Sequence, residues 1–219
     1  MAMLTGDRLR TLIGREETDY TLLMSILSTY KQPRSKISAW LADGTLIRVK
    51  KGLYIFGESH ARIPYCIETL ANLIYGPSAI SLEFALSFYG LIPERVEELT
   101  CITTKKNKHF DTPVGVFSYR HLHPKKYSMG ITQYFINETH PILIATPEKA
   151  LADYLSCRCQ PSAFNKMEDM LLFLKNDLRA DNDILLTLDT SLLREIKTQY
   201  KLEPLEWIIT IIEEKVYYE

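Results

Sequence analysis

The amino-acid sequence predicts an α+β protein whose N-terminal and C-terminal parts are built differently. Apolar residues recur at helical spacing over residues 4–41, and two short strand-like runs end this part at residue 56. From residue 98 the pattern changes to runs of β-branched and aromatic residues that are separated by turn signals. Helical spacing returns at residue 147, so the second part combines a sheet with helices.

Composition agrees with a folded protein that meets an anion at one end. The chain has 219 residues, of which 46% are apolar and 24% charged, enough to bury a core. The formal net charge is only −1, but the charge is unevenly distributed. Residues 1–60 carry nine Lys or Arg and six Asp or Glu, whereas residues 160–219 carry seven and twelve. A basic head with an acidic tail is typical of a protein with different partners at its two ends.

The sequence predicts a cytoplasmic protein without a membrane partner, a metal or another cofactor. No apolar run approaches the roughly 18 residues that a membrane span needs, and residues 1–14 lack the apolar stretch of a signal peptide. The cysteines do not form paired zinc-knuckle motifs, so we expect reduced thiols. They are Cys66, Cys101, Cys157 and Cys159.

Two helices are expected before residue 31. The first covers residues 4–13, and the second begins at Asp19, which is a favourable N-cap. Apolar residues at helical spacing then define the buried face of the second helix. Lys31 and Gln32 follow as a turn.

A third helix and a hairpin complete the N-terminal part. Pro33 suits the first position of a helix, where its missing N–H costs nothing, and Gly44 suits the helix end. Ile37, Trp40 and Leu41 define the buried face. Two strands, 45–49 and 53–56, flank a basic turn at 50–52. Helices followed by a short two-stranded wing are typical of a winged helix-turn-helix, which we place at residues 1–58.

The exposed side of this predicted module is basic, which favours DNA binding. The third helix would enter the major groove with its N-terminal end, where free N–H groups and the helix dipole attract phosphate. Cations of the wing would contact the backbone and position the module. The candidate DNA-binding residues are Lys31, Arg34, Ser35, Lys36, Ser38, Arg48, Lys50 and Lys51.

The alternative is a winged helix that contacts protein, with solvated lysines. Six cations give a salt-dependence slope of at most roughly −5. A single copy would therefore bind DNA weakly, and tight binding would need two copies on repeated sites.

The second part, residues 59–219, is predicted to be an α+β domain. Residues 57–64 read as a linker, a helix covers 65–75, and Ser81 can cap a helix at 82–89. A small, mostly antiparallel sheet flanked by helices is expected. Its strands are 98–104, 114–119, 131–136 and 141–145, and its later helices begin at 147 and cover 164–175, 192–200 and 205–216.

A second basic patch lies between Lys105 and Lys126 and includes Lys106, Lys108 and Arg120. It could touch DNA beside the wing or an acidic partner, or it could simply keep the loops soluble. Two histidines in this stretch, at 121 and 123, lack a recognisable third metal ligand.

No enzymatic motif is found, and we expect that the chain is not an enzyme. There is no glycine-rich phosphate loop and no nucleophile elbow. The acidic pair Glu213 and Glu214 beside Lys215 lies on a helical stripe, and residues 146–149 are explained as a helix start. The C-terminal stripe at 205–216 either packs onto the sheet or offers a face to a cationic protein.

Several blocks of residues, in a fixed order, resemble one known family. They are LIRVKKGLY (46–54), GPSAISLEFALSFYGLIP (76–93), TTKK (103–106), FDTPVGVFSY (110–119) and IATPEKALADY (144–154). The chain resembles the AbiEi family of antitoxins from type IV toxin–antitoxin systems, which act in abortive infection of phage-infected cells. The resemblance spans roughly residues 20–155.

The resemblance implies a repressor that binds the promoter of its own operon through the winged helix. It also implies a C-terminal domain that counteracts a nucleotidyltransferase toxin without needing a stable complex with it. Two alternatives stay open. One is a winged-helix regulator whose second domain senses a ligand, and the other is a nuclease with a DNA-targeting head.

Overall fold

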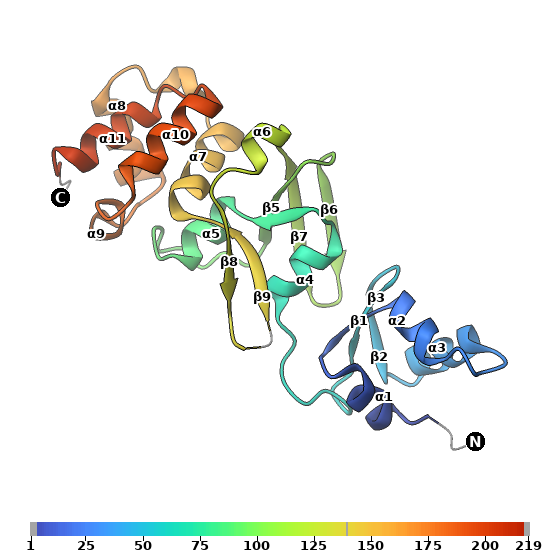
Figure 1. Cartoon of the computed structure of the whole chain (residues 1–219). Helices are drawn as coiled ribbons and strands as arrows, with labels where there is room; N and C mark the ends of the chain where they lie inside the picture. The colour runs from blue at the N-terminus through green and yellow to red at the C-terminus, as the bar shows by residue number, and fades with distance from the viewer. Residues whose placement is uncertain (1–3, 139, 217–219) are drawn as a thin grey trace.

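The computed structural model describes residues 4–138 and 140–216, and these residues form a mixed α+β architecture with two unequal bodies (Figure 1). The smaller body holds the N-terminal residues around a three-stranded sheet, and the larger body surrounds a six-stranded sheet. Within the described part of the chain, no helix is long and apolar enough to cross a membrane.

The smaller body contains three helices and three short strands. Asp19 accepts a hydrogen bond from the Leu22 N–H and caps the second helix, as the sequence predicts. Pro33 lies in the first turn of the third helix, and Gly44 follows that helix with φ 78°. The elements are α1 (Gly6–Ile13), β1 (Glu17–Asp19), α2 (Tyr20–Ile26), α3 (Pro33–Ala42), β2 (Leu46–Lys50) and β3 (Leu53–Phe56).

Strand β1 was not predicted, because its residues are polar and too few to show alternation. It pairs antiparallel with β3, so that the sheet order is β1-β3-β2. The hairpin strands were predicted within one residue at each end. The antiparallel register of β2 and β3 shifts between Arg48 and Lys50. The two basic side chains therefore point in different directions.

The three-stranded sheet packs on both faces. One face meets the helices in a core that contains Trp40, Leu46, Tyr54 and Phe56. The alternate hairpin residues Val49, Leu53 and Ile55 belong instead to the core of the larger body. The hairpin therefore joins the two bodies through apolar contacts.

The larger body is a mixed sheet with helices around it. The strand order is β6-β7-β5-β4-β9-β8, with antiparallel pairing except between β5 and β7 and between β4 and β9. Two strands, β4 and β6, were not predicted because one has three residues and the other is polar. The strands are β4 (Ser78–Ile80), β5 (Leu99–Thr103), β6 (Lys108–Thr112), β7 (Gly115–His121), β8 (Ile131–Phe135) and β9 (Pro141–Ala145).

Helix α4 lies between the bodies, and the C-terminal helices gather at the far end of the molecule (Figure 1). The predicted helix at 164–175 is α8 followed by a π-helical turn at Phe173–Asp177. The helices are α4 (Ile67–Ile74), α5 (Leu82–Phe88), α6 (Pro124–Tyr127), α7 (Pro147–Arg158), α8 (Met167–Leu172), α9 (Asn182–Leu185), α10 (Thr190–Tyr200) and α11 (Leu205–Glu213).

The segment between β3 and α4, predicted as a linker, is held in place by two buried acids. Glu16 Oε1 accepts hydrogen bonds from the backbone N–H groups of Arg62 and Ile63, each at 3.1 Å. Glu17 accepts one from the Cys66 N–H at 3.3 Å. The connection is therefore fixed by hydrogen bonds to the loop and strand at residues 16 and 17.

Candidate nucleic-acid interface

Helix α3 presents a small polar surface over an apolar base. Ile37 and Trp40 are buried, and Leu41 is half-buried against the same core. Arg34, Ser35 and Ser38 are exposed on the other side, as the helical period requires. Gln32 makes no side-chain cap for α3, and Pro33 at the helix start has no N–H that needs a partner.

Two cations of α3 are positioned by aromatic rings of the same body. The Arg34 Nε donates to the Tyr20 hydroxyl at 3.1 Å, which connects α3 to the start of α2. Lys36 Nζ lies 5.0 Å from the centre of the Trp40 ring. Lys31 is exposed in the turn before α3. These contacts fix the direction of the side chains while Arg34 stays exposed.

The three hairpin cations that were predicted to contact DNA differ in their exposure to solvent. Arg48 and Lys51 are exposed. Lys50 is half-buried, and its ammonium donates to the Ile74 carbonyl at the end of α4. Burial lowers the pKa of Lys50, and the nearby Lys105 lowers it further. Lys50 was predicted as a free phosphate contact, but the structure makes it a link between the two bodies.

Two acids of the smaller body, Glu16 and Glu17, are buried, whereas Asp7, Asp43 and Glu58 are exposed. Glu16 and Arg10 are both buried, and the Arg10 Nη2 donates to Glu16 Oε1 at 2.5 Å. Burial alone would raise the pKa of Glu16, but Arg10 and the backbone N–H groups of Arg62 and Ile63 hold it below its ordinary value. Asp43 accepts from the Thr45 N–H at 2.9 Å.

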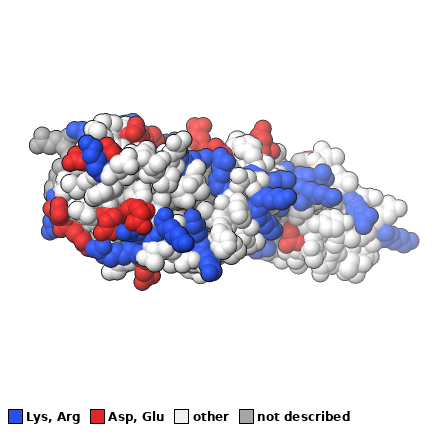
Figure 2. Space-filling model, turned by 90° about the horizontal axis from the view of Figure 1, so that it is seen from above, with Lys and Arg blue, Asp and Glu red and all other residues white. Residues whose placement is uncertain are grey.

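The basic surface continues from the hairpin onto the larger body. Lys105 donates to the Gly76 carbonyl, just beyond the Ile74 carbonyl that Lys50 occupies. Both ammonium groups thus lie at the C-terminal end of α4, where the helix dipole favours cations. Figure 2 shows blue side chains in a band from the tip of the smaller body to the middle of the molecule. Beside it is an open hollow lined by Tyr75, Thr104, Lys105, Lys106, Asn107 and His121.

The second basic patch of the sequence is only partly a surface feature. Tyr119 is buried, and its hydroxyl donates to the Ala71 carbonyl at 2.7 Å. Because Tyr119 faces the core, it cannot stack on a base. Lys106 and Lys108 remain exposed.

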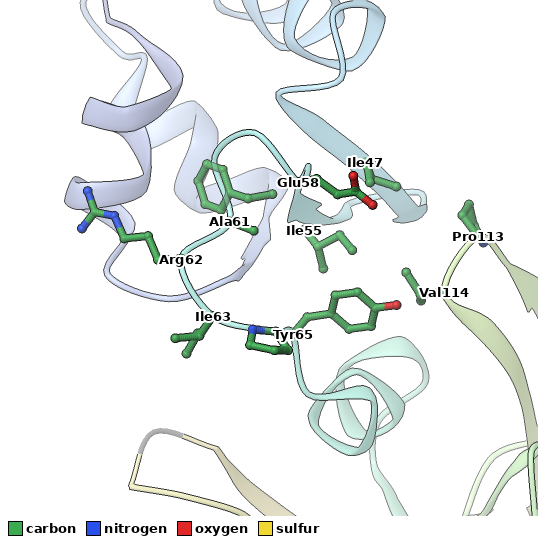
Figure 3. Close-up of a pocket in the computed structure, with 11 residues that line it drawn as sticks. Ile47, Ile55, Glu58, Ala61, Arg62, Ile63, Tyr65, Pro113 and Val114 are labelled. Atoms are coloured by element: carbon green, nitrogen blue, oxygen red, sulfur yellow. The ribbon is translucent and has the colours of Figure 1, made fainter.

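A partly apolar hollow of about 490 Å³ lies between the hairpin and the larger body (Figure 3). Ile47 and Ile55 line it from the hairpin, and Tyr65 reaches across toward Val114 from the segment before α4. Glu58 lies at its rim, whereas Arg62 points away from it. The hollow therefore offers apolar walls and one carboxylate.

A second cluster of polar side chains is enclosed in the larger body. Lys149 and Asp153, one helical turn apart on α7, are completely buried, with Nζ 3.2 Å from Oδ1. The Tyr200 hydroxyl of α10 donates to the same Oδ1 at 2.5 Å, and Ser81 Oγ donates to Oδ2 at 2.6 Å. Ser81 therefore makes no side-chain cap for α5, which corrects the expectation from the sequence.

This buried cluster joins four segments of the chain. Lys149 Nζ also contacts the Tyr200 oxygen at 2.6 Å and the Lys126 carbonyl at 3.0 Å. Burial lowers the pKa of Lys149 and raises that of Asp153, while their mutual contact acts in the opposite direction on each. Lys149 and Asp153 are both completely buried. The cluster is therefore suited to holding these segments together. The four-residue spacing of Lys149 and Asp153 was the only sequence signal for it.

Among residues 4–138 and 140–216, no three His, Cys, Asp or Glu are grouped so that they could hold a metal ion. All four cysteines are free, and burial raises the pKa of the Cys157 thiol to about 11. Glu213, from the acidic pair noted in the sequence, accepts two hydrogen bonds from Arg194.

Comparison with known proteins shows a similarity of fold to one solved structure. Neither a protein-family model nor a curated protein matches the sequence. The crystal structure of the RV2827C protein from Mycobacterium tuberculosis is similar, with a TM-score of 0.58 and 13% sequence identity. The similarity covers 100% of this chain and 84% of that one. At this identity it supports the α+β fold of the whole chain.

Proposed function

We propose that this protein is a DNA-binding repressor with an antitoxin domain, of the kind that the AbiEi resemblance implies. Residues 1–58, of which 1–3 lie outside the described residues, would form a winged-helix domain that binds the promoter of its own operon. Residues 59–219 would counteract a nucleotidyltransferase toxin. The protein would act in the cytoplasm, without a cofactor and without an enzymatic activity of its own.

The observation that carries the DNA-binding part is the set of exposed cations on the smaller body. Glu16 and Glu17 are buried, while Lys31, Arg34 and Lys51 are exposed. Exposed cations gathered on one body attract a polyanion. Helix α3 adds exposed serines, whose hydroxyls can donate to or accept from base edges.

Binding can be tested with the DNA immediately upstream of the gene. The full chain should bind this fragment more tightly than a shuffled fragment of equal composition and length. Replacing Ser35 and Ser38 by alanine should reduce the difference between the two fragments, because these residues would face base edges. Equal affinity for both fragments would contradict promoter recognition.

The antitoxin part needs a separate readout. A full-length variant with Arg34, Arg48 and Lys51 changed to glutamine should lose repression of a promoter reporter. It should still rescue cells that express the neighbouring nucleotidyltransferase, because the changes lie outside residues 59–219. Loss of rescue by a stable, folded variant would contradict the proposed division of labour.

The alternative function is a regulator whose second domain senses a ligand, and the hollow between the bodies favours it. Its walls come from the hairpin and from the larger body, so a small apolar ligand there would contact both. Filling the hollow by Val114→Phe should then change DNA affinity in the absence of any added ligand. An unchanged DNA affinity in this variant would contradict a regulatory role for the hollow.

A further inference from the structure

Strand β7 carries two side chains with buried polar atoms that lack a hydrogen-bond partner. They are the Ser118 hydroxyl oxygen and the Nε of Arg120, and neither has a partner among the described residues. Ser118 is only 8% exposed. Buried polar groups in folded proteins are nearly always paired, so two unpaired atoms on one strand indicate a missing partner.

The two side chains lie on the same face of the sheet. Successive strand residues point to opposite faces, so Ser118 and Arg120 share one face while Tyr119 is buried in the core on the other. Thr100 of β5 lies opposite Ser118, and its hydroxyl donates to the Ser81 carbonyl at 2.7 Å. The neighbouring hydroxyl is therefore satisfied within the fold, whereas the two polar groups of β7 are not.

Arg120 is half-buried and has no carboxylate partner. Within the described part of the chain, no Asp or Glu oxygen lies within 4.0 Å of its guanidinium. By contrast, Arg10, Arg158 and Arg194 are each paired with a glutamate. Because a guanidinium is always charged in proteins and matches oxyanions geometrically, an arginine without an acid favours an external anion.

Both side chains line an open hollow of about 260 Å³ over β6 and β7. Asn107 and His109 line it beside them, and Glu98 lines it just before β5. The Asn107 Oδ1 accepts from the His121 N–H at 2.7 Å, so its amide NH₂ group stays available as a donor. The hollow is smaller than the roughly 300–1,000 Å³ of a drug-sized ligand site, so it suits a small polar group.

The charge of the hollow also favours an anion. Of the described residues that line it, Glu98 alone is acidic, and its Oε1 lies 3.6 Å from the His109 Nδ1. Asn107 also lines the neighbouring hollow that contains Lys105 and Lys106. Cations on both sides of Asn107 therefore give this end of the sheet a positive potential.

We propose that this hollow binds a phosphate group, held mainly by the Arg120 guanidinium and also by the Asn107 amide and the Ser118 hydroxyl. A tetrahedral oxyanion can accept from donors on several sides, whereas the two oxygens of a carboxylate lie in one plane. The phosphate belongs either to a small ester or to a DNA backbone. The proposal stands without promoter binding, because it concerns only this face of the larger body.

Replacing the arginine tests the site in the full chain. In phosphate-free buffer at constant ionic strength, an NMR titration with inorganic phosphate or adenosine monophosphate measures the dissociation constant. Arg120→Gln should raise it by about tenfold or more, because charge-assisted hydrogen bonds are lost. Arg95→Gln is the matched control, since it removes the same charge from an exposed residue outside the hollow and should bind like the wild type. Equal thermal unfolding without phosphate establishes that both variants fold.

Two further variants change the affinity in opposite directions, which a purely structural role of these residues would not do. Glu98→Gln removes the acid of the hollow and should tighten phosphate binding by about two- to fivefold. Ser118→Ala removes one donor and should weaken phosphate binding by roughly threefold to tenfold.

The source of the phosphate follows from the DNA affinity of Arg120→Gln. An unchanged DNA affinity together with weaker binding of inorganic phosphate assigns the site to a small phosphate ester. A loss of both affinities assigns it to the DNA backbone. Wild-type protein that binds neither inorganic phosphate nor adenosine monophosphate up to about 10 mM would overturn the proposal. So would equal phosphate affinities of Arg120→Gln and Arg95→Gln.

Discussion

The smaller and the larger body use charge in opposite ways. In the smaller body the acids at 16 and 17 are buried, and Arg34, Arg48 and Lys51 stay in solvent. In the larger body Lys149 is completely buried and satisfied by Asp153, Tyr200 and a backbone carbonyl. Exposed cations add little to stability but remain available to a partner, whereas a buried pair is committed to the fold. Substitutions of the exposed cations should therefore change DNA binding, whereas substitutions in the buried cluster should change the free energy of unfolding.

The largest expected effect comes from the buried cluster. Asp153→Ala leaves Lys149 enclosed without its counter-ion and should lower the free energy of unfolding by about 3–5 kcal/mol. Urea denaturation monitored by tryptophan fluorescence and circular dichroism measures this change. Glu94→Ala is the matched control, because it breaks the exposed Arg179–Glu94 pair and should cost at most about 1 kcal/mol. Equal losses in the two variants would contradict the contrast between buried and exposed charge.

The buried acid of the smaller body should give an intermediate effect that depends on pH. Its folded pKa is held below the ordinary 4.5, so Glu16 stabilises the fold above that pH, and this stabilisation is lost as the pH falls through the folded pKa. Glu16→Gln should cost about 1–3 kcal/mol at pH 7 and less at pH 3. Exposed Glu58→Gln should change neither value. A cost that is the same at both pH values would exclude this ionisation as the cause.

The smallest effect should distinguish two neighbouring lysines of the hairpin. Lys51→Ala removes an exposed cation and should flatten the salt dependence of DNA binding by about one unit of slope. Lys50→Ala should change the slope less, because its ammonium is bound to the Ile74 carbonyl. Fluorescence anisotropy between 50 and 200 mM salt, a range of about fourfold, measures both slopes. A larger slope change for Lys50→Ala would mean that Lys50 leaves Ile74 when DNA binds.

The sequence predicts the periodic and well-capped elements of this fold, and it misses what tertiary pairing alone creates. Asp19 and Pro33 mark helix starts through local chemistry, so their positions could be predicted. Strand β1 has three polar residues and exists only because β3 lies beside it. The mixed pairing of the larger sheet likewise depends on which strands meet, which local patterns do not encode.

The candidate site shows the same limit at the level of single side chains. Helical periodicity separated Ile37 and Trp40 from Arg34 and Ser38, and the structure agrees. The orientation of Lys50 depends on the bulge in β2 and on the position of Ile74, which lies 24 residues away in the sequence. Ser81 looked like a helix cap until Asp153, 72 residues later, provided a stronger partner.

The central claim is that the exposed cations of the smaller body bind DNA, and its most direct test is the salt dependence of binding to the upstream fragment. A variant with Lys31, Arg34 and Lys51 changed to glutamine should flatten the slope by about two to three units and unfold at the wild-type urea concentration. An unchanged slope in this folded variant would contradict the claim, because the DNA would then contact some other surface.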